Sequence, residues 1–217
     1  MKKIAPLIIA IFLLISCKGG ALSNVTRCNG GALSNVTDPL KDAKTGDVVF
    51  QKLPGELSQV ISEVTESPIA HCGMVIKEEN GAIDVIEAVG PVRIIPLEQF
   101  IKNGIDSKYA LIRLKDKNFK DFSAVANEAK KFLGKPYDFL YQFDDEHIYC
   151  SELVYKAFLN AAKIKIAKTI KLKDLKYKDN IDFIKSLTGG DLPLDREMVT
   201  PVDIYKSDLF EMKFSNY

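Results

Sequence analysis

A cysteine placed before an amphipathic segment is the first residue in this sequence that could do covalent chemistry. Cys150 directly precedes residues 151–162, where apolar side chains recur with helical spacing. At a helix N-terminus a cysteine meets unpaired backbone N–H groups and the positive end of the helix dipole, and both favour the thiolate. Cys150 is therefore the candidate nucleophile, although a buried cysteine that only fills space is the commoner case.

His71, one of two histidines in the sequence, is the candidate base. A nucleophilic cysteine needs a base within hydrogen-bond reach, and that base needs a third polar group to hold its tautomer. Glu87 lies in the apolar run of residues 85–89, where an unpaired carboxylate is costly. If residues 80–81, Asn-Gly, form a hairpin turn, residues whose numbers sum to about 160 face each other, which puts Glu87 opposite residues 72–76. The pairing of Glu87 with His71 is a hypothesis at this point.

The segments that must position these residues alternate between strand and helix patterns. Strands are expected over residues 47–51, 71–77, 82–89, 92–95 and 109–114, and helices over residues 56–65, 97–102, 122–133, 151–162 and 180–187. Signals weaken after residue 163, where residues 199–204 indicate a last helical turn or an edge segment. Helices and an antiparallel sheet that occupy separate stretches of the chain predict an α+β domain over residues 41–217.

The first residues have the pattern of a bacterial lipoprotein signal peptide. Lys2 and Lys3 precede an almost continuous apolar run over residues 4–15, which is shorter than the roughly 20 residues of a membrane-spanning helix. The run ends in Leu-Ile-Ser-Cys, which resembles a lipobox, so residues 1–16 are the expected leader and Cys17 the lipidation site. An ordinary secretory signal is the alternative. The lipid would hold the protein on a membrane of the cell envelope, facing outside the cytoplasm.

Residues 17–40 contain an internal duplication. Gly-Gly-Ala-Leu-Ser-Asn-Val-Thr occurs at residues 19–26 and again at residues 30–37. Two copies of eight residues are too few and too short for a solenoid. Small and polar residues indicate a flexible tether between the lipid and the domain.

The balance of charge argues against a nucleic-acid partner. Lys and Arg number 30 and Asp and Glu number 29, so the basic excess of a duplex-binding protein is missing. His71, Cys72, His147 and Cys150 are residue types that bind zinc. Adjacent strand residues point to opposite faces, however, so His71 and Cys72 are not expected to share one ion. We expect neither a metal nor a cofactor.

Five segments together resemble the YaeF/YiiX family of permuted papain-like enzymes, relatives of the NlpC-type cysteine peptidases. They are Gly-Asp-Val-Val-Phe-Gln at 46–51, Ser-Pro-Ile-Ala-His-Cys-Gly-Met-Val at 67–75, Ile-Glu-Ala at 86–88, Gly-Lys-Pro-Tyr-Asp at 134–138 and Tyr-Cys-Ser-Glu-Leu-Val at 149–154. The histidine precedes the cysteine, which is the permuted order. The resemblance implies a permuted papain-like fold, with Cys150 as nucleophile, His71 as general base and Glu87 as the residue that orients the base.

The chemistry that this resemblance implies is hydrolysis of an amide or ester through a thioacyl enzyme, as in an amidase or peptidase. The N–H of Cys150 is a candidate oxyanion donor, and Tyr149 and Tyr137 are candidates for lining the substrate cleft. Cell-wall peptides and lipid or acyl amides are the candidate substrates. Two alternatives stay open: transfer of the acyl group to a lipid or peptide acceptor, and a lipoprotein that binds a lipid or peptide without turnover.

Overall fold

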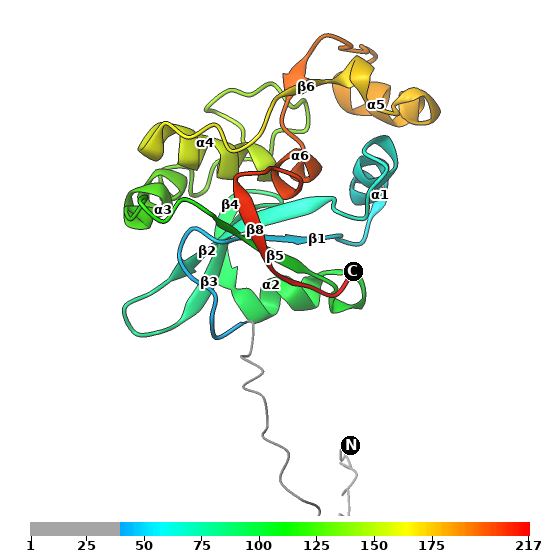
Figure 1. Cartoon of the computed structure of the whole chain (residues 1–217). Coiled ribbons are helices and arrows are strands. Elements are labelled where there is room, and N and C mark those ends of the chain that lie inside the picture. The colour runs from blue at the N-terminus through cyan, green and yellow to red at the C-terminus, as the bar shows by residue number, and fades with distance from the viewer. Residues whose placement is uncertain (1–39) are drawn as a thin grey trace, which may run out of the picture. The chain divides into compact units, whose positions relative to one another are not determined.

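An antiparallel sheet of six strands forms the centre of the fold (Figure 1). The structure is a computed structural model that describes residues 40–217, so the leader, the predicted lipidation site Cys17 and the duplicated segments of the tether lie outside the described residues. The strands lie in the order β4, β3, β2, β1, β5, β8. Their bounds are Val48–Gln51 for β1, His71–Lys77 for β2, Ile83–Ala88 for β3, Val92–Pro96 for β4, Ala110–Leu114 for β5 and Phe210–Ser215 for β8.

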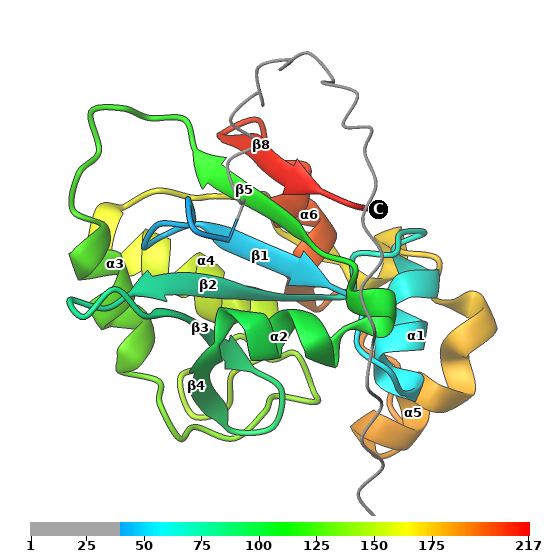
Figure 2. The same ribbon diagram turned by 90° about the horizontal axis from the view of Figure 1, so that it is seen from below.

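Helices cover both faces of this sheet, as Figure 2 shows for α2 and α4. One face carries Cys72 and Met74 and packs against α3 (Phe122–Lys130) and α4 (Cys150–Ala162). The other face carries Val75 and Val85 and packs against α2 (Leu97–Asn103). Because successive strand residues point to opposite faces, a strand that is covered on both sides is apolar along most of its length.

Two further helices lie side by side at one end of the sheet in both Figure 1 and Figure 2. They are α1 (Glu56–Val64) and α5 (Ile181–Thr188). Between α4 and the end of the chain lie the short paired strands β6 (Ile170–Lys171) and β7 (Glu197–Met198), and α6 (Pro201–Tyr205). Single helical turns occur at Ile105–Ser107, Leu172–Asp174 and Lys178–Asn180. No helix among residues 40–217 is long and apolar enough to cross a membrane.

The predicted α+β fold is confirmed, and the predicted elements up to residue 162 are present. The largest difference among them is α3, which ends at Lys130 rather than at residue 133. Strand β8 was not predicted, because it is an edge strand in which only Phe210 is buried and no clear alternation of apolar and polar residues results. Residues 199–204, left open between helix and edge segment, contain most of α6.

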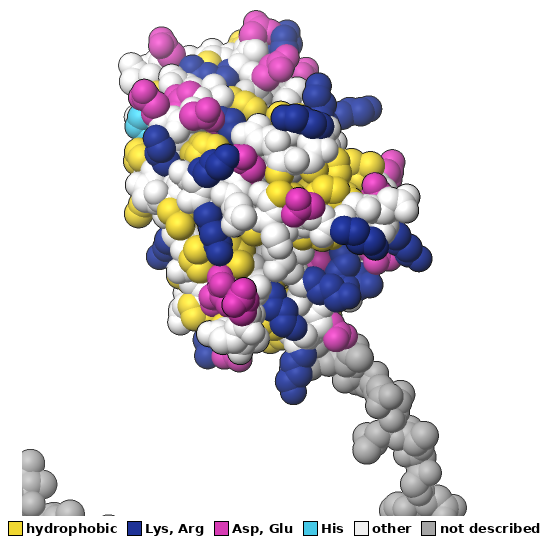
Figure 3. All heavy atoms as spheres, turned by 90° about the vertical axis from the view of Figure 1, so that its left-hand side faces the viewer, with side chains coloured by type: hydrophobic (Ala, Val, Ile, Leu, Met, Phe, Trp, Pro, Cys, Tyr) yellow, Lys and Arg dark blue, Asp and Glu magenta, His cyan; other side chains and the backbone are white. Residues whose placement is uncertain are grey.

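Basic and acidic side chains are mixed over the face of the molecule shown in Figure 3, with hydrophobic side chains exposed between them. That distribution agrees with the near-equal totals of basic and acidic residues in the sequence. A single-sign surface of the kind that attracts a polyanion is not seen on this face.

Candidate active site

Cys150 is the first residue of α4 and is buried between that helix and the sheet. Its N–H belongs to the first turn of the helix, where no intrahelical acceptor exists. The start of α4 is held by Glu152, whose Oε2 accepts from the N–H of Tyr149 at 3.2 Å and whose Oε1 lies 2.7 Å from the Lys156 Nζ. Burial raises the pKa of Glu152 to about 7 despite this lysine. The sulfur therefore lies at the positive end of a helix whose first turn is fixed by side-chain contacts.

His71 is joined to Glu87 by a hydrogen bond of 2.7 Å between the histidine Nε2 and the glutamate Oε2. The predicted hairpin is confirmed: Glu87 on β3 pairs with Gly73 on β2, whose numbers sum to 160. The imidazole stacks on the Phe100 ring of α2, with ring centroids 5.6 Å apart. With Nε2 engaged by Glu87, Nδ1 is the ring nitrogen left for Cys150.

Arg93 on β4 holds the other oxygen of Glu87. The Nε and Nη2 atoms of Arg93 lie 2.9 and 2.8 Å from the glutamate Oε1, a two-pronged contact of the kind that fixes a carboxylate's orientation. Glu87 is fully buried, and the hydrogen bonds and charges of His71 and Arg93 outweigh its burial and lower its pKa. Arg93 was not among the site residues that the sequence predicted. Its position opposite Glu87 on β4 follows only from the register of the β3–β4 pair.

The electrostatics of the site favour a thiolate and an imidazolium at neutral pH. Burial by itself disfavours the charge on His71, but hydrogen bonds to Cys150 and Glu87 outweigh it and raise the histidine pKa to about 9. Hydrogen bonding from Cys72 and from His71 lowers the pKa of Cys150 well below its ordinary value, against the opposing effect of burial. The cysteine can thus carry the negative charge that a nucleophile needs.

Cys72 also contacts Cys150, which sequence analysis did not anticipate. Both its thiol and its backbone N–H lower the pKa of Cys150, whereas burial and the neighbouring sulfur raise the pKa of Cys72 itself. His71 and Cys72 lie toward opposite faces of the sheet, as adjacent strand residues do: His71 stacks on Phe100 of α2, and Cys72 packs in the core on the side of α4. Both nevertheless interact with Cys150, which begins α4 at the end of the sheet where β2 starts.

The two tyrosines expected at the cleft occupy different places. Tyr137 lines a cavity beside His71, and burial raises the pKa of its phenol, which stays protonated. Tyr149 is fully buried and lines neither cavity described below, so the expectation that it lines the cleft does not match its position. Its hydroxyl accepts from the N–H of Val199 at 3.1 Å and its ring packs on Tyr141, which makes it part of the core.

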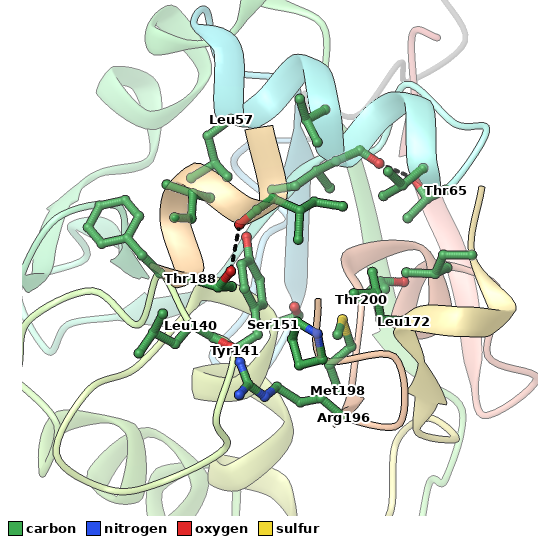
Figure 4. A pocket seen from close by; sticks show the side chains of 18 of the residues that line it. Leu57, Thr65, Leu140, Tyr141, Ser151, Leu172, Thr188, Arg196, Met198 and Thr200 are labelled. Carbon is green, nitrogen blue, oxygen red and sulfur yellow. Dashed lines mark hydrogen bonds between the residues drawn. The ribbon is translucent and has the colours of Figure 1, made fainter. Parts of the chain in front are cut away.

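Each of the candidate residues Cys150 and His71 lines a cavity. The two cavities share the α1 residues Leu57 and Ile61 in their walls. The first, called here the apolar cavity, includes Cys150 in its wall but not His71. Figure 4 shows α1 with Leu57 and Thr65 along one side of it. Its apolar lining comes from α1, α5 and neighbouring segments: Leu57, Val60, Ile61, Val64, Leu172, Leu175, Phe183, Ile184, Leu187, Met198 and Val199.

The second cavity, called here the His71 cavity, has a volume of about 220 Å³ and includes His71 but not Cys150. Its wall contains the first turn of α1 and the side chains of Ala70, Ala88 and Tyr137. The base and the candidate nucleophile therefore open to different spaces. This separation suits a substrate with two chemically different halves on either side of a reacting bond.

Residues 42–212 match the model of a family described as permuted papain-like amidase enzymes, YaeF/YiiX, C92 family. The chain belongs to this family. YiiX of Escherichia coli strain K12 is 34% identical over 165 residues, which are 75% of this chain and 81% of YiiX. A crystal structure described as metalloprotein YiiX from Escherichia coli O157:H7 superposes with a TM-score of 0.74 at 31% identity, covering 81% of this chain and 98% of that one.

Membership of the YaeF/YiiX family makes this protein a papain-like amidase or peptidase with the permuted fold, as its sequence predicted. The description of YiiX as a metalloprotein applies to that protein. Here the Nε2 of His71 is taken by Glu87, and His147 is exposed on a loop. Within residues 40–217 no three or more His, Cys, Asp and Glu side chains are arranged to hold a metal ion.

Proposed function

We propose that this YaeF/YiiX-family enzyme hydrolyses amides of aliphatic acids, with Cys150 as nucleophile, His71 as acid and base, and Glu87 as the residue that orients His71. The observation that carries the substrate class is the apolar cavity, in which the candidate nucleophile opens onto aliphatic side chains of α1 and α5. The cavity has a volume of about 90 Å³, so it holds the first carbons of an acyl chain, each of whose buried methylenes gains about 0.8 kcal/mol. A cell-wall peptide, the other candidate substrate, has polar amides and charges, for which this wall offers only Arg196 and a few hydroxyl groups beside its aliphatic side chains.

The reaction begins with attack of the Cys150 thiolate on the amide carbonyl, which forms a carbon–sulfur bond and an oxyanion. The N–H of Cys150, unpaired at the start of α4, is one donor to that oxyanion. The His71 imidazolium then gives its proton to the amine nitrogen as the carbon–nitrogen bond breaks. Neutral His71 next takes a proton from water, which attacks the thioester and releases the acid and the thiolate.

Tyr137 is assigned to substrate contact, because it lines the His71 cavity and its phenol is neutral. The sequence leaves hydrolysis and acyl transfer open, and the same residues serve both. The outcome depends on whether water or another nucleophile reaches the thioester. A competition between water and added amines or alcohols, measured by mass spectrometry of the products, separates the two.

An intact-mass experiment tests the function. The protein is exposed to N-acyl amides of graded chain length and to cell-wall peptides, and a mass increase equal to the acyl group is sought on Cys150. Cys150→Ala should lose the adduct and the turnover while keeping the fold, since the sulfur is only a small part of the core. Ile184→Trp, which narrows the apolar cavity on α5, should shift the preferred acyl chain to a shorter one. Adducts only with cell-wall peptides would contradict the assignment to acyl amides.

We also propose that Cys17 carries a lipid that keeps the enzyme at a bacterial membrane. The support is the Leu-Ile-Ser-Cys sequence after the apolar leader. Cys17→Ser should move the protein from the membrane fraction to the soluble fraction and abolish its labelling by a fatty-acid analogue. Cys28→Ser is the matched control and should change neither measurement.

A further inference from the structure

Two cysteines lie in contact at the start of α4. Cys150 is the first residue of this helix and Cys72 is the second residue of β2, and both belong to the core between the helix and the sheet. Neither sulfur is in a disulfide. Cys72 reaches the Cys150 sulfur with two groups, its thiol and its backbone N–H. The hydrolysis proposed above forms and breaks bonds at the Cys150 sulfur alone, which leaves the chemistry of the second sulfur unused.

We propose that the two sulfurs form a modification site, in which a hydroperoxide oxidises Cys150 and Cys72 then closes a reversible disulfide with it. The oxidant is hydrogen peroxide or an alkyl hydroperoxide. The modified enzyme lacks its nucleophile, so amide hydrolysis stops until a dithiol reduces the disulfide. Formation of the disulfide depends on the two sulfurs and not on the substrate, so its test is independent of the proposed function.

The two sulfurs differ in access to a small molecule. Cys150 lies in the wall of the apolar cavity, whereas Cys72 lies in the wall of neither cavity. The apolar cavity has a volume of about 90 Å³, several times the roughly 10–15 Å³ that a single water requires. Hydrogen peroxide, or the peroxide end of an alkyl hydroperoxide, therefore has room beside Cys150.

The two sulfurs also differ in protonation. Hydrogen bonding from the Cys72 thiol and from His71 lowers the pKa of Cys150, whereas burial and the neighbouring Cys150 raise the pKa of Cys72. The thiolate is the form of cysteine that peroxides oxidise. Both differences make Cys150 the sulfur that is oxidised first and Cys72 the thiol that reacts with the product.

The modification takes place in two steps. The Cys150 thiolate attacks one oxygen of the hydroperoxide, the O–O bond breaks, and the alkoxide or hydroxide that leaves takes the proton of the His71 imidazolium. The Cys150 sulfur has then lost two electrons to the peroxide and is a sulfenic acid. In the second step the Cys72 sulfur attacks the Cys150 sulfur, the S–O bond breaks, and the hydroxyl group leaves with the Cys72 proton as water.

The disulfide would also protect the nucleophile. A sulfenic acid that finds no thiol is oxidised further to a sulfinic acid, which ordinary thiols do not reduce. A disulfide is reduced by a dithiol, which is itself oxidised to a disulfide. Cys72 thus decides whether Cys150 recovers after exposure to peroxide.

Peptide mapping of the whole protein tests the proposal. The protein is treated with hydrogen peroxide, the remaining free thiols are blocked with N-ethylmaleimide, and the peptides that contain Cys72 and Cys150 are identified by mass spectrometry. We expect the two peptides joined to each other, without the two thiol hydrogens. Amide hydrolysis should be lost as this species forms and should return on addition of dithiothreitol. Cys28→Ser is the matched control and should give the same joined peptides.

Cys72→Ser separates the proposal from a role for Cys72 in packing alone, because it keeps a small polar side chain and removes the sulfur. In this variant dimedone should trap the sulfenic acid of Cys150, and continued exposure should give the sulfinic acid. The activity that dithiothreitol restores, relative to the same variant before oxidation, should therefore fall with time of exposure, whereas the wild type should recover in full. Cys72→Ala is the second variant and should behave in the same way.

A Cys150 sulfinic acid with a free Cys72 in the oxidised wild type would overturn the proposal. So would a disulfide of Cys150 with Cys28, or a Cys72→Ser protein that recovers as fully as the wild type. Absence of any acyl adduct on Cys150 with any amide would instead overturn the proposed function, and the peptide mapping would still decide the disulfide.

Discussion

Glu87 lies directly opposite Gly73 on the paired strands β3 and β2, two residues along β2 from His71. Residues two apart on a strand share a face, so the carboxylate of Glu87 reaches the imidazole diagonally across the position of the glycine. The space that a side chain at this position would fill is occupied by the Cγ1 of Val85 and the carbonyl oxygen of Ile86, with the Cβ of Glu87 beside them. The hydrogen bond of 2.7 Å between Glu87 and His71 thus depends on a residue without a side chain.

Gly73→Ala should disrupt this relationship. The new Cβ would lie 2.4 Å from the Cγ1 of Val85 and 2.9 Å from the carbonyl oxygen of Ile86, so β2 and β3 would have to separate. We expect overpacking to lower the free energy of unfolding by about 1–3 kcal/mol. We also expect kcat/KM to fall under conditions in which the variant is still fully folded, so that unfolding does not account for the loss of activity. Urea unfolding and kinetics measure the two effects. Gly90→Ala, where nothing lies within 4 Å, is the control and should change neither.

Arg93 should be a positioning residue for the Glu87 and His71 pair. Arg93→Met leaves the Oε1 of the buried glutamate without its partner, at a cost of about 1–3 kcal/mol. We expect kcat to fall about tenfold with little change in KM, because Arg93 contacts Glu87 and not the substrate. Arg93→Lys should recover part of the rate, since a lysine keeps the charge but makes one contact in place of two. An unchanged kcat in Arg93→Met would mean that Glu87 orients His71 without needing its contact with Arg93.

The rate should depend on pH through the ion pair of Cys150 and His71. Above about 9 the imidazole loses the proton that the leaving amine needs, so kcat/KM for an amide should fall there. On the acid side, activity should persist below the ordinary thiol pKa of about 8.5, because the pKa of Cys150 is lowered. A rate for p-nitrophenyl esters that stays level above about pH 9, where that for amides falls, would confirm His71 as the acid, because p-nitrophenolate leaves without a proton.

The free energy of unfolding should also depend on pH through His71. Its pKa is raised from 6.5 to about 9 in the folded protein, so the folded state holds the proton more tightly than the unfolded state. The resulting stabilisation is complete below pH 6.5 and is lost as the pH rises to about 9. The lowered pKa of Cys150 acts in the opposite sense, because the folded protein has already released the thiol proton that the unfolded chain holds up to a pH of about 8.5. The two contributions oppose each other above pH 6.5, so the unfolding free energy of the wild type should stay nearly level up to a pH of about 8.5. In Cys150→Ala only the histidine contribution remains, and the unfolding free energy should fall with pH over the same range. An identical slope in both proteins would contradict the ion pair.

Cys72 should make Cys150 more reactive. The thiol of Cys72 keeps its proton and donates to the neighbouring thiolate, which is the largest cause of the lowered pKa of Cys150. Iodoacetamide should therefore alkylate Cys150 faster than Cys72 near neutral pH. Cys72→Ala should move the pH dependence of Cys150 alkylation toward higher pH, whereas Cys72→Ser, which keeps a donor, should move it less. Alkylation of both sulfurs at one rate would remove the basis for this assignment.

The sequence determined the fold class and the three residues at its centre. Apolar periodicity located the helix that begins at Cys150, the Asn-Gly turn set the register that brings Glu87 beside Gly73, and the order of motifs identified the permuted papain-like family. These features depend on residues close together in the chain or on strands joined by one tight turn. Local preference and short loops are enough to specify them.

Only the tertiary structure decided which other side chains meet at the site. Arg93 and Cys72 lie on separate strands, and whether they reach Glu87 and Cys150 depends on how those strands and α4 pack. The same holds for the apolar cavity, whose walls join α1 to α5 across more than half the domain's sequence. Contacts between residues that are far apart in the chain follow no periodic pattern in the sequence, so a single sequence does not predict them.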